Sequence, residues 1–92
     1  MSHSIEETVA KTVGVLNKID AYRQEVDMAF SWVEKELQKD NSQEKKAALE
    51  SAKNKLNLTK EFLNKEEELF KKTLKDKDFG IILEVAQFVR KF

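Results

Sequence analysis

Cysteine and proline are absent from this 92-residue sequence, and glycine occurs only as Gly14 and Gly80. Without cysteine the chain forms no disulfide, no thiolate metal site and no cysteine nucleophile, and its redox compartment stays open. Without proline, and with so little glycine, the composition does not interrupt helices. These absences favour long, regular helices.

Long apolar stretches are also missing, since no run approaches the roughly 18 apolar residues of a membrane span. The polar N-terminal stretch MSHSIEETVAK lacks the apolar centre of a signal peptide. We therefore expect a soluble protein without a membrane partner, and by default a cytoplasmic one.

Chemical motifs are lacking as well. Histidine occurs once, as His3, and one imidazole without a second His or Cys does not make a metal site. The sequence holds no glycine-rich phosphate loop, no nucleophile elbow and no paired Glu-x-x-His arrangement. We expect no metal, no cofactor and no enzymatic activity.

Charge is abundant but balanced, with 17 basic and 17 acidic residues. Residues 1–42 carry five basic and eight acidic residues, whereas residues 43–77 carry ten and seven. The resulting net charges of −3 and +3 predict two helices of opposite sign lying side by side. The overall balance argues against a general nucleic-acid partner.

A first helix is predicted over about 5–39. Ser4 and Glu7 form the S-x-x-E capping box that starts a helix. A nearly strict 3.5-residue repeat typical of a coiled-coil seam follows, at Ile5, Val9, Thr12, Leu16, Ile19, Arg23, Val26, Phe30, Val33 and Leu37. Arg23 breaks the apolar pattern, and we expect a nearby carboxylate to pair with it, from Asp20, Asp27, Glu61 or Glu66.

A tight turn over residues 40–42 separates this helix from a second one over about 43–76. Asn41 favours turns, and with Glu44 it offers a second capping box. The seam of the second helix is less regular, at Leu49, Ala52, Leu56, Thr59, Leu63, Glu66, Phe70 and Thr73. A long antiparallel helical hairpin is therefore expected.

The C-terminal stretch predicts a third, shorter helix over about 79–91, with Asp78 as its N-cap and one wide apolar face. The predicted fold class is all-α, a coiled-coil-like three-helix bundle in a single domain over 1–92. Dimerisation would turn it into a four-helix arrangement.

Both long helices carry apolar residues beside the seam, which predict a groove along one edge of the hairpin. The flanking residues are Val15, Tyr22 and Ala29 on the first helix and Ala48, Phe62 and Leu69 on the second. We expect the third helix to run antiparallel to the second and to cover the half of the groove remote from the turn. The half near the turn stays bare.

Trp32, the only tryptophan, falls near the bare half of the groove. We expect it to form an apolar protein-binding patch with Ala29, Ala48 and Leu58, with Tyr22 at its border, since tryptophan is enriched at binding hot spots. The alternative is that Trp32 is half-buried core.

The favoured function is a non-enzymatic helical protein–protein interaction module that docks on a protein partner or self-associates as a homodimer through this groove. One alternative is a small inhibitor or immunity-type protein that blocks a toxin or an enzyme. A further alternative is a nucleic-acid-associated accessory protein that uses the lysines of the second helix.

Overall fold

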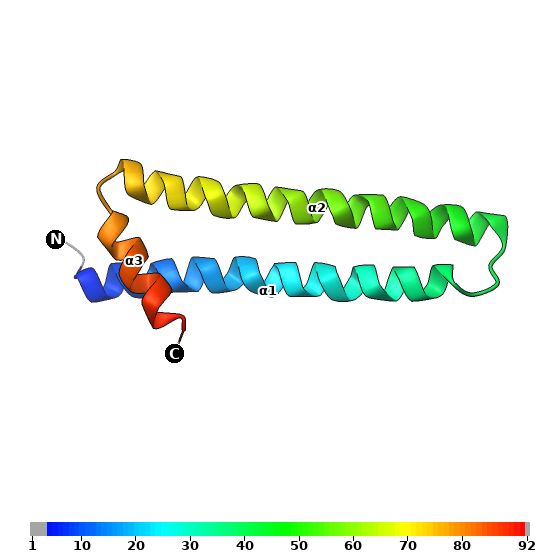
Figure 1. The fold of residues 1–92 in the computed structure, drawn as a ribbon, viewed down its shortest axis with the longest axis horizontal. Helices are drawn as coiled ribbons and strands as arrows, with labels where there is room; N and C mark the ends of the chain where they lie inside the picture. The colour runs from blue at the N-terminus through cyan, green and yellow to red at the C-terminus, as the bar shows by residue number, and fades with distance from the viewer. Residues whose placement is uncertain (1–3, 92) are drawn as a thin grey trace. The chain divides into compact units, whose positions relative to one another are not determined.

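The computed structural model describes residues 4–91, so His3 lies outside the described residues. It contains three helices, α1 (Ile5–Leu37), α2 (Gln43–Asp76) and α3 (Gly80–Val89) (Figure 1). The predicted all-α hairpin with a shorter third helix is confirmed. Within the described residues, no helix is both long and apolar enough to span a bilayer.

The chain divides into two compact units, which we describe separately. The hairpin unit comprises Ala21–Asn64, which includes the turn between α1 and α2. The α3 unit comprises the described residues up to Asp20 together with those from Lys65 onward. Both long helices therefore contribute to both units.

The seam positions of α1 are largely shielded from solvent. Buried positions are Val9, Thr12, Leu16 and Val33, and half-buried positions are Ile19, Arg23, Val26, Phe30 and Leu37. Ile5, at the first residue of the helix, is exposed. The N-terminus is capped as expected on one side, because the backbone N–H of Glu7 donates to Ser4 Oγ at 3.1 Å.

The seam of α2 is shielded only where it is apolar. Leu49 is buried, and Ala52, Leu56, Leu63 and Phe70 are half-buried. The polar seam positions Thr59, Glu66 and Thr73 are exposed. The polar positions that interrupt the apolar repeat of α2 are therefore the seam positions that solvent reaches.

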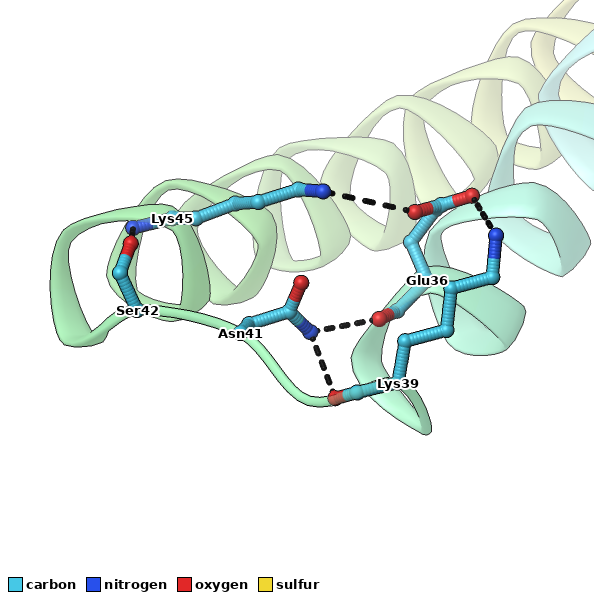
Figure 2. Close-up of polar contacts among 5 residues, drawn as sticks. All are labelled: Glu36, Lys39, Asn41, Ser42 and Lys45. Carbon is cyan, nitrogen blue, oxygen red and sulfur yellow. Dashed lines mark hydrogen bonds and ion pairs between the residues drawn. The ribbon is translucent and has the colours of Figure 1, made fainter.

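The turn between α1 and α2 is closed by Asn41, but not in the way that the sequence suggested (Figure 2). The Asn41 Nδ2 donates to the carbonyl oxygens of Glu36 at 2.6 Å and Lys39 at 2.9 Å. Asn41 therefore satisfies carbonyls at the C-terminal end of α1 instead of capping α2, and α1 ends at Leu37, earlier than expected.

Ser42 takes the capping role that was predicted for Asn41. Its Oγ accepts a hydrogen bond from the backbone N–H of Lys45 at 3.2 Å (Figure 2). Its carbonyl oxygen accepts one from the backbone N–H of Lys46 at 2.9 Å. The sequence places two N-cap residue types side by side, Asn41 and Ser42. The open carbonyls of α1 attract the amide donor and leave the hydroxyl for α2.

The connection from α2 to α3 is a Schellman motif. The N–H of Phe79 donates to the carbonyl of Leu74 at 2.7 Å, and the N–H of Asp78 donates to that of Lys75 at 3.2 Å. Asp78 has a left-handed φ of 62°. The prediction of Asp78 as N-cap of α3 is therefore wrong, since Asp78 terminates α2 and Phe79 occupies the N-cap position without a side-chain cap.

α3 lies across the N-terminal part of α1 (Figure 1). Its buried residues are Ile82, Leu83 and Ala86, and two of them form a core cluster with Val9, against which Val13 packs. Arg90, just after α3, pairs with Asp20 and donates from Nε to Asn17 Oδ1 at 3.0 Å. Apolar packing and polar contacts thus tie both ends of α3 to α1.

This position corrects the expectation that α3 would run along α2 and cover the predicted groove. Val15 and Leu69, the groove residues of this unit, remain exposed. The face that α3 uses contains Val9, Val13 and Asp20, and the directions of Val13 and Val15 differ by about 160° around the helix. The α3 helix therefore packs on another face of α1.

Candidate protein-interaction surface

Trp32 lies on the surface of the hairpin unit, with 58% of its area exposed. It lines a shallow, open hollow of about 500 Å³ together with Met28, Ser31, Asp27 and Lys35. Met28 is 73% exposed. Two large apolar side chains at i and i+4 therefore form neighbouring projections on one face of α1.

This face points away from the seam with α2. The next residue, Val33, is almost fully buried, and consecutive helical residues point about 100° apart. Met28 lies farther around the helix than Trp32 and still farther from Val33. Trp32 is therefore not part of the hairpin core, which was the alternative at the sequence level.

The other predicted interface residues are also on the surface. Tyr22 and Leu58 expose 51% and 64% of their areas, and Ala29 and Ala48 are exposed. The hollow at Trp32, however, is lined by α1 alone. Met28 was not among the predicted interface residues, although its four-residue spacing from Trp32 was the available signal.

Ion pairs lie along one edge of the hairpin unit, and apolar residues lie along the opposite edge. Lys60 contacts Asp27 at 2.8 Å, and Lys53 contacts Glu34 at 4.0 Å. Lys53 Nζ also lies 5.5 Å from the ring centre of Phe30. Tyr22 and Ala29 project about 140° away from these acids, by helical geometry. With the exposed Phe62 and Leu58 of α2, they form an apolar edge.

Arg23 is half-buried at the seam, with its Nε atom in the interior. Among the acids considered as its partners, Asp27 pairs with Lys60 and Asp20 pairs with Arg90. Asp20 and Arg23 each have a further interaction as well. Its place in the seam is consistent with a structural charge and gives no sign of a ligand site.

Glu36 organises the charges of the turn (Figure 2). Lys39 donates to its Oε1 at 2.8 Å, and Lys45 Nζ lies 3.7 Å from its Oε2. The hydrogen bond from Lys39 lowers the pKa of Glu36 below its ordinary 4.5, and the charges of Lys39 and Lys45 act in the same direction, while partial desolvation opposes them. Glu36 thus remains ionised and links the last turn of α1 to the first turn of α2.

Among the described residues, 4–91, no cluster of three or more His, Cys, Asp or Glu side chains is placed to hold a metal ion. The hollow at Trp32 offers apolar contact through Trp32 and Met28, bordered by the charges of Asp27 and Lys35.

Comparison of the chain with protein-family models, with curated proteins and with solved structures gave no significant match.

Proposed function

We propose that this chain is a non-enzymatic protein-interaction module that binds a protein partner, or a second copy of itself, through the surface around Trp32. We define the Trp32 surface as Met28 and Trp32 with the neighbouring apolar edge of the hairpin unit, which contains Tyr22, Ala29 and Leu58. Ala48, on the same helix as Leu58, extends this edge toward the turn.

The observation that carries the proposal is the exposure of the only tryptophan beside an exposed methionine. Tryptophan residues dominate the energetics of many protein interfaces, and methionine adapts its shape to apolar partners. Binding would release the water around these side chains. Each Å² of apolar area removed from water would stabilise the complex by about 25 cal/mol. A protein with an apolar surface of its own is therefore the partner that this exposed pair favours.

The charges beside the hollow support a protein partner over a nucleic acid. One acidic and one basic residue, Asp27 and Lys35, line it, and Asp27 already binds Lys60. A phosphate backbone requires several cations on one face. Mixed charges instead suit the polar rim of a protein interface.

Site-specific photo-crosslinking tests this proposal. A photoreactive benzoylphenylalanine replaces Met28, which is exposed and adjacent to Trp32, and the chain is irradiated in the cells that express it. The same substitution in a Trp32→Ala background is the matched control. We expect an adduct of defined mass that decreases about tenfold or more in the control, because a hot-spot residue contributes about 2 kcal/mol.

The mass of the adduct distinguishes the two kinds of partner. An adduct of twice the chain mass indicates self-association, and an adduct with another protein identifies that protein for reconstitution with purified components. If that protein is an enzyme or a toxin, the module is of the inhibitor type. An adduct pattern that Trp32→Ala does not change would contradict the proposal.

A further inference from the structure

The apolar face of α3 is wider than the part of it that is buried. Ile82, Leu83 and Ala86 face the interior. On the adjoining part of the apolar face, Ile81 is 69% exposed, and Val85, Phe88 and Val89 are exposed as well. An amphipathic helix normally buries its apolar face. The arrangement within the α3 unit leaves this outer side facing solvent.

The outer side of α3 continues into an apolar groove against α1. Val85 and Val89 line this groove from α3, and Ile5, Ala10 and Val13 line it from α1. Its volume is about 500 Å³. The outer α3 surface, which we define as Ile5, Val13, Ile81, Val85, Phe88 and Val89, is therefore contiguous within one unit.

We propose that the outer α3 surface is a homodimer interface, in which a second copy of the chain packs its own α3 antiparallel against it around a two-fold axis. An isologous contact of this kind needs no other component, because each copy supplies the same apolar surface to its partner. This inference goes beyond the Trp32 surface, which lies in the hairpin unit and stays available to a different protein.

Charge complementarity supports a second copy as the occupant. Glu84 on α3 and Lys91, just beyond the C-terminal end of α3, are both exposed and lie seven residues apart. In an antiparallel pair with Phe88 near the axis, Glu84 of each copy lies beside Lys91 of the other. Because the chain has no net charge, long-range repulsion does not oppose the association.

The available area also fits a dimer. The exposed fractions of these side chains correspond to roughly 500 Å² on one copy, in the range of the largest apolar patches on monomers. Two copies together would bury roughly 1,000 Å², the lower limit for a specific interface. A reversible dimer of modest affinity is therefore expected.

A membrane surface is a weaker match for the same helix. Interfacial helices carry lysine and arginine on their polar face, whereas the polar residues of α3 are Glu84 and Gln87, and its two nearest cations, Arg90 and Lys91, follow the end of the helix. Arg90 already pairs with Asp20. The cationic face that attracts anionic lipid is therefore missing from α3.

Sedimentation equilibrium of the full chain over a wide concentration range tests the dimer. We compare the wild type with Ile81→Gln/Phe88→Gln on the outer α3 surface, and with the matched control Met28→Gln/Trp32→Gln on the Trp32 surface. We expect the wild type to shift from 10.7 kDa to twice that mass with increasing concentration. The α3 variant should raise the dimer Kd about 100-fold or more, and the control should leave it unchanged.

Cross-linking tests the antiparallel orientation of the two α3 helices with substitutions that leave the apolar side chains unchanged. Because the chain has no cysteine, single cysteines can be introduced by Glu84→Cys in one sample and Lys91→Cys in another. Mixing the two with a short bismaleimide should link them faster than it links Met28→Cys to itself.

Three results would overturn this inference: a wild type that stays monomeric at the highest concentration, a dimer that only the Trp32-surface control dissociates, and equal linking rates for the two pairs. The second result would leave self-association through Trp32 standing, so that failure of the α3 interface is distinguishable from failure of the proposed function.

Discussion

At the scale of single residues, the ends of the helices are governed by a few polar side chains. At the first turn, Asn41 donates to carbonyls at the end of α1, and Ser42 accepts from a backbone amide of α2. Asp78 performs the corresponding task after α2 by adopting a left-handed conformation. Asparagine and aspartate tolerate that conformation, but glycine adopts it without steric cost.

The first prediction concerns Asp78→Gly, which should stabilise the fold by about 0.5–1 kcal/mol. Glycine is the preferred residue at this position of a Schellman motif, and the change also removes a negative charge from the C-terminal end of α2. The urea unfolding midpoint measures the effect. Lys77→Gly, one residue earlier, is the control, and it should lower the midpoint because it only adds backbone freedom. A lower midpoint for both variants would contradict the motif.

The second prediction concerns Glu36, whose pKa is lowered mainly by the hydrogen bond from Lys39. A carboxyl with a lower pKa in the folded than in the unfolded chain stabilises the fold above its unfolded pKa. This contribution is lost as the pH falls through the folded pKa. Glu36→Gln should therefore reduce stability at neutral pH and match the wild type at a pH well below 4.5.

Urea unfolding of wild type and Glu36→Gln across this pH range measures the difference. If the gap between the two proteins stays constant or widens on acidification, the turn does not depend on ionised Glu36.

At the scale of elements, α3 contributes most to the interior of its unit. Ile82 and Ala86 form a core cluster with Val9 of α1, and Leu83 is also buried. The outer residues of the same helix are more exposed. The two sides of α3 therefore have separate roles, one in folding and one in the proposed dimer.

The third prediction compares two identical substitutions at different burial. Leucine is replaced by alanine at Leu83 on α3, which is 3% exposed, and at Leu58 on α2, which is 64% exposed. Leu83→Ala should cost about 2–5 kcal/mol, since it removes buried methyl groups and leaves a cavity. Leu58→Ala should change stability by about 0.5 kcal/mol or less. Similar thermal unfolding midpoints for both variants would contradict the packing of α3.

The periodicity of the sequence predicted the helices and their seams well, because a 3.5-residue repeat such as Val9, Leu16 and Val33 records burial directly. It did not predict the side on which α3 packs. The choice depends on contacts between residues far apart in the chain, such as Arg90 with Asp20, and local spacing does not encode them. The exposure of Trp32 was predicted, whereas its neighbour Met28 was overlooked because only the groove side of α1 was considered.

At the scale of the whole molecule, acidic and basic residues are segregated between the two long helices. Within the hairpin unit this segregation appears as lysines of α2 facing acids of α1, at Lys60–Asp27, Lys53–Glu34 and Lys45–Glu36. Exposed pairs of this kind contribute about 0–1 kcal/mol each. They align the helices without engaging the apolar Trp32 surface, which therefore stays available for binding.

The central claim is that Trp32 is uncovered in the isolated chain and becomes covered by a protein. Because the chain has one tryptophan, its fluorescence and its quenching by acrylamide report on this residue alone. In dilute protein we expect red-shifted emission that acrylamide quenches readily. Addition of the cross-linked partner, or concentration of the chain where the adduct is a dimer, should shift the emission to the blue and protect it. Blue-shifted, protected emission already in the dilute monomer would contradict the account.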